Sequence, residues 1–349
     1  MLQHIKNIEN KKIIFAPLDW GLGHFYRLIP FIYIYSKKNN LIFLYCSKKI
    51  KYIAKKELEP FNINIKYITT KSLNIKYSYN GLTLKNLTSI FFKLLLQSFF
   101  DTYFAKKIVK KHKIDFIISD CRYFFRNKKV FSVFITHQLN FATPKKFLFI
   151  KKFALKINKY LIEKFNECWV LDISSKPNFA GFLSENILKI NNIQYIGIIS
   201  RFQIFNNKNL CSTNLKNNSK KIVLCLLSLP YPYKKNVLSK IIKKFINSNY
   251  KVFIIKGDFY KKKNSIKKIK NIIILDYIQT SHLLKKIISA DFIVCTSGYT
   301  TLMDLISLNK KAYLIPTKGQ WEQEYLAKYF IFNYNFFSFN DLFINLSSI

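Results

Sequence analysis

The sequence predicts an α/β protein with two doubly wound domains, each a parallel sheet with helices on both faces. Short apolar runs rich in branched and aromatic residues alternate with longer stretches of helical spacing, which is the rhythm of βαβ units. The rhythm occurs twice, and residues 202–220 between the two occurrences are polar, Asn-rich and without period. With 349 residues, the chain is long enough for two domains with complete cores.

The first domain is expected to span residues 1–202. Helical spacing begins at residue 25 and returns over 84–111 and 144–165. In a doubly wound sheet the first and fourth strands are neighbours where the strand order reverses, so the loops at their carboxyl ends meet. The predicted strands are the apolar runs at 12–17, 41–46, 63–69, 114–119, 130–136 and 167–171, with residues 195–197 closing the sheet.

A linker is expected over residues 203–219, followed by a second domain over 220–330. Helical spacing occurs near 236–247 and again from Thr300. The segment 331–349 is expected to pack back on the first domain. The predicted strands of the second domain are residues 221–227, 250–256, 271–275, 292–295 and 312–315.

The formal charge of +40 would attract polyanions such as nucleic acid or an anionic bilayer. However, Lys, Ile, Asn, Phe and Tyr are enriched together along the whole length, which indicates a compositional bias more than a binding stripe. The six cysteines include no close pair, which favours free thiols in a reducing compartment. No apolar run approaches the roughly 20 residues that span a bilayer, and residues 1–6 lack a signal core. We therefore expect a cytoplasmic protein.

Residues 290–327 are the most informative stretch. A buried strand ends in the turn Ser297-Gly298, and a helix containing Asp304 follows. Such a turn points free backbone N–H groups and the positive helix end at one place, which favours a phosphate. A second strand then leads through Pro316 into a polar loop, residues 317–324. A structural explanation is also available, because Thr301-x-x-Asp304 has the form of a helix capping box.

This order of features resembles the nucleotide-sugar site of glycosyltransferase family 28, within the two-domain GT-B fold. The resemblance implies two Rossmann-like domains that face each other across a cleft, and a nucleotide-diphosphate sugar, UDP-linked, as co-substrate with no further cofactor. It also implies a role for each matching position. Ser297, Gly298 and Thr301, with Tyr299 and Thr300 between them, face the donor diphosphate; Asp304 holds the ribose hydroxyls; Gln320 and Gln323 touch the sugar; Ile278 lies where backbone groups hold the base.

The loop after the first strand, Asp19 to His24, resembles the first Gly-rich loop of GT-B glycosyltransferases through Gly21, Gly23 and His24. A lone Gly-x-Gly also fits an ordinary tight turn. The sequence departs from the family pattern in two places. This loop carries fewer glycines, and residues 228–232, after the first strand of the second domain, carry none where the family binds donor phosphate.

His24 and Asp120 are predicted to form a catalytic pair. Each follows one of the two strands at the switch point, and glycosyl transfer to a hydroxyl requires a base for the acceptor proton. An imidazole suits this task, and a carboxylate behind it fixes the tautomer and stabilises the imidazolium. Asp19 is the competing carboxylate. Arg122, His137 and Gln138, at the ends of neighbouring strands, are expected on the acceptor side together with Asp19.

The leading prediction, implied by the resemblance, is an inverting hexosyltransferase. We expect it to be metal-independent, since no Asp-x-Asp is present to hold a metal. The acceptor is expected to be a hydroxyl on a lipid-linked or cell-envelope precursor. The basic amphipathic stretch 144–165 suits packing on a sheet and also peripheral contact with the inner face of an anionic membrane. Alternatives are a MurG-type N-acetylglucosaminyltransferase of peptidoglycan synthesis, a UDP-sugar epimerase, and a charge-driven nucleic-acid or membrane-binding protein. No specific nucleic acid is expected.

Overall fold

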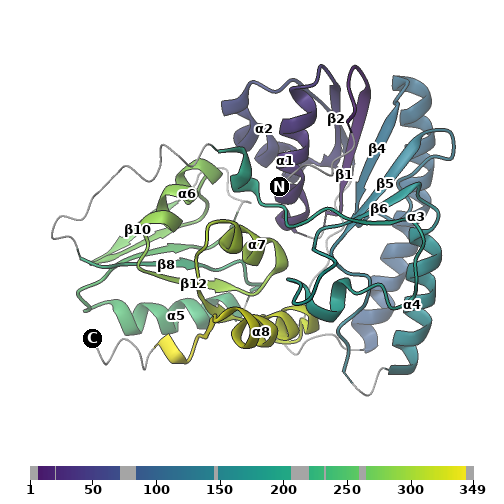
Figure 1. Ribbon diagram of the computed structural model, residues 1–349. Helices are drawn as coiled ribbons and strands as arrows, with labels where there is room; N and C mark the ends of the chain where they lie inside the picture. Colours follow the sequence, from purple (N-terminus) through teal and green to yellow (C-terminus); the bar gives the residue numbers. More distant parts are fainter. Residues whose placement is uncertain are drawn as a thin grey trace. The chain divides into compact units, whose positions relative to one another are not determined.

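The computed structural model describes residues 7–19, 21–70, 84–144, 148–205, 220–231, 233–258 and 265–342, with side chains omitted for 84–96 and 148–150. The described chain forms two compact units, one up to Arg201 and one from Phe202 onward (Figure 1). Most of the predicted linker lies outside the described residues. The five described cysteines are free thiols.

The first unit contains a parallel sheet of seven strands in the order β3-β2-β1-β4-β5-β6-β7. The order runs outward in both directions from the β1–β4 pair, so the predicted switch point between the first and fourth strands is confirmed. Each predicted strand is present, with ends shifted by up to two residues. The strands are β1 Lys12–Pro17, β2 Leu41–Ser47, β3 Ile65–Thr70, β4 Phe116–Asp120, β5 Phe131–Thr136, β6 Glu167–Val170 and β7 Ile193–Tyr195.

Helices cover both faces of this sheet. Successive residues of a strand point to opposite faces. In β1, Phe15 contacts the ring of Tyr35 on α1, whereas Ile14 belongs to the core cluster that contains Ala105 of α3. The helices are α1 Leu22–Ser36, α2 Lys48–Leu58, α3 Leu84–His112 and α4 Leu148–Ile162, with short 3-10 turns at Glu59–Phe61, Gly181–Ser184 and Arg201–Ile204. Residues 145–147, predicted to be helical, lie outside the described residues.

The second unit repeats the plan with the strand order β10-β11-β9-β8-β12-β13-β14. All neighbours are parallel except β10 and β11, which are antiparallel. Figure 1 shows α5 on one face of this sheet and α6 and α7 on the other. The elements are β8 Ile222–Leu226, α5 Tyr233–Phe245, β9 Lys251–Ile255, β10 Ile266–Ile269, β11 Ile272–Leu275, α6 Thr280–Ser289, β12 Phe292–Thr296, α7 Tyr299–Ser307, β13 Tyr313–Ile315, α8 Trp321–Tyr334 and β14 Phe337–Ser338.

The predicted strands of the second unit are present, but β10, α6 and β14 were not predicted. Strand β10 reads Ile-Lys-Lys-Ile and lies exposed at the sheet edge, so it lacks the apolar run that marks a buried strand. Helix α8 begins at Trp321, inside the segment predicted to be a loop.

The C-terminal segment differs from the expectation that it packs on the first domain. Helix α8 ends at Tyr334, and Asn335 adopts the left-handed conformation with φ of 54°. The chain then pairs as β14 with β13, and Leu342 is fully buried in the core of the second unit. In the described part of this segment, residues 337–342 therefore complete the second sheet and its core.

Candidate active site

The switch point of the first sheet brings the loop after β1 next to the end of β4. Pro17 is in register with Asp120, and the Leu18 N–H donates to the Asp120 carbonyl oxygen at 2.9 Å. Gly21 adopts an extended conformation and caps α1, which begins at Leu22. Gly23 therefore lies in the first turn of the helix, and the expected Gly-rich loop is shorter than the sequence indicated. No atom lies within 4 Å of a Cβ built at Gly21, so packing does not require glycine there.

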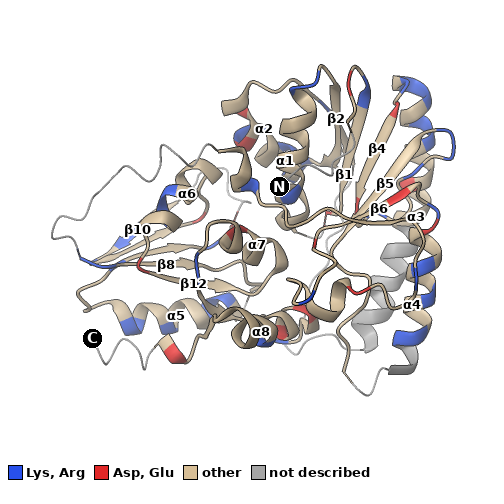
Figure 2. Ribbon diagram, viewed as in Figure 1, with Lys and Arg blue, Asp and Glu red and all other residues tan. Residues whose placement is uncertain are grey.

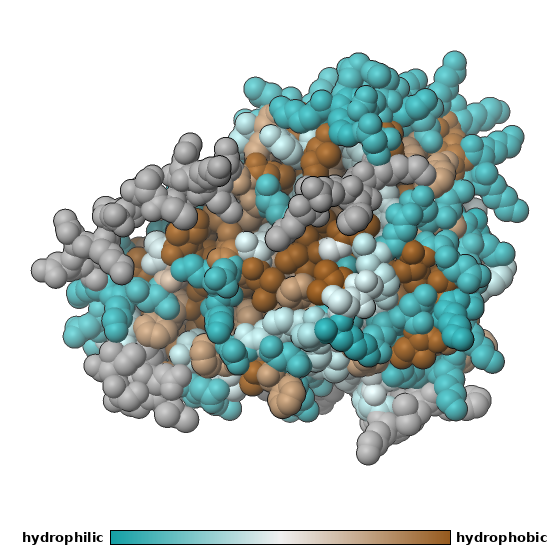
Figure 3. Space-filling view, viewed as in Figure 1, coloured by the Kyte–Doolittle hydropathy of each residue, from teal (hydrophilic) through white to brown (hydrophobic). Residues whose placement is uncertain are grey.

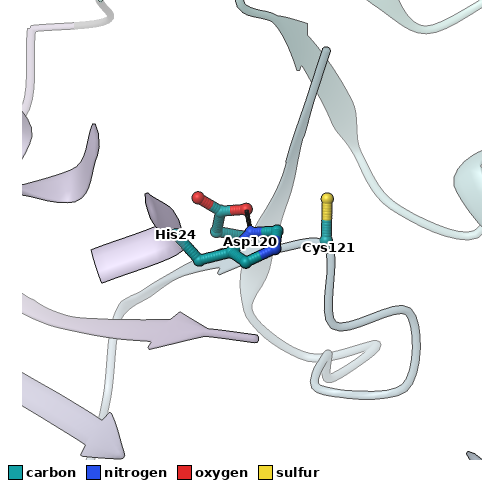
Figure 4. A group of neighbouring side chains, drawn as sticks. All are labelled: His24, Asp120 and Cys121. Carbon is teal, nitrogen blue, oxygen red and sulfur yellow. Dashed lines mark hydrogen bonds and ion pairs between the residues drawn. The ribbon is translucent and has the colours of Figure 1, made fainter. Parts of the chain in front are cut away.

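This geometry places the His24 side chain against Asp120. His24 Nδ1 lies 2.9 Å from Asp120 Oδ1, the Asp120 side chain is fully buried, and the His24 side chain retains 20% of its exposure (Figure 4). The strand order predicted that these two residues would approach each other, and the structure brings them into contact. The Asp120 carboxylate therefore engages the ring through Nδ1 and not through Nε2.

Arg27 is a third member of this cluster that sequence reasoning missed. It lies one turn after His24 on α1, is 2% exposed, and engages both oxygens of Asp120. Arg27 Nε lies 2.5 Å from Oδ2, while Nη2 contacts Oδ1. The sequence carried a signal for it, because Arg27 is the only charged residue between Gly21 and Ser36, an otherwise apolar helix.

The charges of the cluster shift two pKa values in opposite directions. Burial raises the pKa of Asp120, but Arg27 and His24 outweigh burial and hold it well below its ordinary value. Burial and the Arg27 charge lower the pKa of His24, but the Asp120 carboxylate outweighs them and raises it to about 9. Asp120 is therefore an anion at all physiological pH values, and His24 in the resting protein carries a proton at neutral pH.

His24, Asp120 and Cys121 have ligand atoms within 4.8 Å of one another, as a metal site requires (Figure 4). The place among them is filled by the Arg27 guanidinium. Arg27 Nη2 lies 2.9 Å from His24 Nδ1 and 3.3 Å from Cys121 Sγ, and it contacts Asp120 Oδ1. A cation already satisfies these atoms, so the cluster is a charge-compensated carboxylate site.

The other residues predicted on the acceptor side have different partners. His137 joins the cluster, because its Nδ1 lies 2.8 Å from Arg27 Nη1. Asp19 accepts a hydrogen bond from Ser47 Oγ at 3.0 Å, and Arg122 pairs with Asp101 Oδ2 at 3.4 Å while lying over the Tyr45 ring. The Gln138 backbone N–H donates to Thr136 Oγ1, which closes a turn after β5.

In the second unit, β12 turns through Ser297 and Gly298 into α7. Gly298 is the N-cap residue and makes no side-chain cap hydrogen bond. The capping box Thr301-x-x-Asp304 is not formed, because the helix begins at Tyr299 and Asp304 lies in its second turn, 2% exposed. Tyr299 is also buried, whereas Thr300 and Thr301 are half-buried.

Hydrogen bonds tie this turn to the start of α8. Ser297 Oγ donates to the Gln323 carbonyl oxygen at 2.7 Å, and Gln323 Oε1 accepts from the Thr317 N–H at 3.1 Å. Gln323 Nε2 donates to Gln320 Oε1 at 2.5 Å. The two motifs that the sequence separates by about twenty residues are therefore in direct contact. Ile278 lies half-buried between β11 and α6, at the same carboxyl-end edge of the sheet.

The sequence of the second unit matches the model of a known protein family. The model of the Glycosyltransferase family 28 C-terminal domain matches residues 202–333. The chain carries a family 28 glycosyltransferase domain. It is a glycosyltransferase, and the predicted resemblance to family 28 is confirmed. No curated protein matches the sequence closely enough to be reported as a relative.

The fold of this glycosyltransferase is similar to that of several solved structures. The glycotransferase of kitacinnamycin matches with a TM-score of 0.62 at 10% identity, covering 91% of this chain and 84% of the other. The calicheamicin glycosyltransferase CalG4 matches with 0.61 at 10% identity, covering 92% and 84%. MurG from Acinetobacter baumannii matches with 0.51 at 12% identity, covering 96% and 90%. The GT-B fold predicted from the sequence is confirmed.

The glycosyltransferase also has an ion-pair cluster at the carboxyl ends of β9 and β11, which was not predicted. Lys256 pairs with the fully buried Asp276, and Lys234 pairs with Asp258 at 2.6 Å. Burial raises the pKa of Asp276, but Lys256 and Ser265 outweigh it and lower the pKa to about 2. The signal was available in the sequence, since Lys256 and Asp276 each directly follow an apolar strand.

Among the described residues, no helix is both long and apolar enough to cross a bilayer.

The His24–Asp120 pair predicts how stability depends on pH. Because folding raises the pKa of His24 to about 9, its stabilisation is complete below the unfolded value near 6.5 and is lost as pH rises through about 9. The difference in free energy of unfolding between wild type and His24→Gln should shrink by up to about 3 kcal/mol between pH 6 and pH 10. Urea unfolding at both pH values measures it. A gap that stays constant or widens at pH 10 contradicts the assignment.

Proposed function

We propose that the chain is an inverting glycosyltransferase that moves a hexosyl group from a UDP-linked sugar to a hydroxyl acceptor. The observation that carries the proposal is the contact of His24 with the buried anion Asp120, in a chain whose second unit is a family 28 domain. The His24–Asp120 contact supplies a base whose second nitrogen can take the acceptor proton.

The proposed reaction is a single displacement. The acceptor oxygen attacks the anomeric carbon while His24 Nε2 takes the hydroxyl proton, and the bond from the anomeric carbon to the diphosphate breaks. The bonding electrons leave with the diphosphate oxygen, so the anomeric configuration inverts. Asp120 stabilises the imidazolium that forms, as a carboxylate behind an imidazole does in other hydroxyl-activating sites.

The second unit would hold the donor. The positive end of α7, which begins after Ser297 and Gly298, would meet the charge that develops on the leaving diphosphate, without a metal. Asp304 would bind the ribose hydroxyls, Gln320 and Gln323 the sugar, and the backbone at Ile278 the base, as the family resemblance implies. The hydrogen bonds that join Ser297, Gln323 and Gln320 keep these donor contacts in one place before the donor arrives.

We further propose that the acceptor is lipid-linked and that the first unit contacts an anionic membrane from its cytoplasmic side. Aromatic side chains are exposed on α4 at Phe153 and Tyr160 and on α3 at Phe99 and Tyr103. Lysines line both helices, and Figure 3 shows hydrophobic surface set among hydrophilic side chains around α4 (Figures 2 and 3). Exposed aromatic groups combined with positive charge suit the headgroup region of an anionic bilayer.

Nucleotide binding is tested by thermal unfolding with UDP, CMP and GDP. A ligand that binds only the folded state stabilises it, by about 2.7 kcal/mol at a concentration of 100 Kd. UDP should raise the melting temperature more than CMP or GDP, and Asp304→Asn should reduce the shift. His24→Gln should retain the full UDP shift, since His24 lies in the other unit. Equal shifts with all three nucleotides, or none, would count against the donor assignment.

Turnover tests the base. His24→Gln should lower kcat/KM about 100- to 10,000-fold at the wild-type optimum, the usual contribution of a positioned general base. The assay follows UDP release from UDP-hexoses in the presence of lipid-linked and soluble hydroxyl acceptors. The matched control is His282→Gln, the same substitution at an exposed histidine, which should leave the rate within about twofold. Equal rates for the two variants would remove His24 from the mechanism.

A further inference from the structure

Arg27 stands at the centre of the first unit's polar cluster. Its guanidinium contacts both oxygens of Asp120, lies 2.9 Å from His24 Nδ1, and lies 2.8 Å from His137 Nδ1. A guanidinium is always charged, has only donors and presents them in a fixed plane. Arg27 therefore constrains the proton positions on every group that it touches.

On His24, Arg27 and Asp120 compete for the same nitrogen. Both Arg27 Nη2 and Asp120 Oδ1 lie 2.9 Å from Nδ1. If Nδ1 accepts a hydrogen bond from Arg27, the ring is neutral and its proton is on Nε2, which then has no lone pair with which to accept the acceptor proton. If Nδ1 donates to Asp120, the neutral ring presents a lone pair at Nε2. The more the Arg27 guanidinium compensates the Asp120 carboxylate, the less that carboxylate favours the His24 tautomer with its proton on Nδ1.

For His137, the contact with Arg27 allows only one neutral tautomer. Arg27 Nη1 can only donate, so His137 Nδ1 must accept, and the neutral ring carries its proton on Nε2. His137 follows β5 and is 7% exposed, so it is held at the same carboxyl-end edge as Asp120.

We propose that Arg27 is a positioning residue for glycosyl transfer. Arg27 compensates part of the negative charge of Asp120, so that only the remainder acts on His24, and it holds His137 in the tautomer with its proton on Nε2. This role rests on the proposed function for the reaction itself. Three groups face His24 in the described structure: Asp120 and Cys121 from the end of β4, and Arg27 from its own helix. Of the charged groups among them, Asp120 favours the imidazolium and Arg27 opposes it.

The proposal makes a prediction of definite sign. In Arg27→Met the whole charge of Asp120 faces His24, so the pKa of His24 should rise by one unit or more above its wild-type value. In Arg27→Lys, which keeps the charge, the pKa should stay within about half a unit of wild type. If Arg27 were only scaffolding, its loss would loosen Asp120 and the pKa of His24 would fall.

The experiment is an NMR titration of isotopically labelled histidine in the free full-length protein, so it requires no substrate. The matched control is Arg122→Met, which removes a buried arginine that follows the same strand but pairs with Asp101 instead of Asp120, and should leave the pKa of His24 unchanged. In kcat/KM, the acid limb of Arg27→Met should move to higher pH by the same amount as the pKa, about tenfold in rate per unit below the limb.

If Arg27→Met does not fold, the proposal can be tested on the wild-type protein by the nitrogen chemical shifts of its histidines. The nitrogen chemical shifts should show a proton on Nε2 and none on Nδ1 of neutral His137, and a proton on Nδ1 of His24. A proton on His137 Nδ1, or an unchanged or lower pKa of His24 in folded Arg27→Met, overturns the role of Arg27 whatever the protein catalyses. The expected pKa shift without any change in the acid limb of turnover would instead overturn the assignment of His24 as base.

Discussion

The first unit depends on the compensation of one buried carboxylate. Asp120 has no exposed surface, and an uncompensated charge there would cost several kcal/mol of folding free energy. Arg27 binds both of its oxygens and His24 approaches one of them. The carboxylate is held at the switch point because β1 and β4 are in register there, so the sheet topology determines which side chains can compensate it. The same requirement keeps Arg27 and His24 on the inner face of α1.

The second unit arranges its candidate site by other means. Gly298, the N-cap of α7, has no side chain with which to cap the helix, and the Ser297–Gln323 hydrogen bond fixes the turn against α8. The first unit thus concentrates full charges, whereas the second offers backbone dipoles to a charged ligand. This division suits a reaction in which the anion arrives with the substrate and leaves with the product.

Much of the fold was predictable because buried parallel strands can be recognised in the sequence as short apolar runs rich in branched residues, as at residues 12–17 and 292–295. The contact between His24 and Asp120 followed from strand order alone. The edge strand β10 was not predictable, because a sheet edge buries too little to leave an apolar run. The start of α8 at Trp321 was missed since polar residues fill its first turn.

Arg27 shows a different limit of sequence reasoning. An arginine on a helix is usually solvated, and only the tertiary contact with Asp120 makes burial possible. Arg122 and Asp19 were predicted on the acceptor side from their position after a strand, and the structure adds that they pair with Asp101 and Ser47. Position at the carboxyl edge predicts which residues are near the site, whereas the partner of each side chain has to come from the structure.

The central claim is that His24, made basic by Asp120, takes the acceptor proton. The most direct test is the pH dependence of kcat/KM for the wild-type enzyme, set beside the NMR titration of His24 in the free protein, because kcat/KM reports groups of the free enzyme. The account predicts a rate that rises with pH through a midpoint near 9 that coincides with the titration of His24. A rate that is flat between pH 7 and pH 10, or a midpoint separate from that titration, would contradict it.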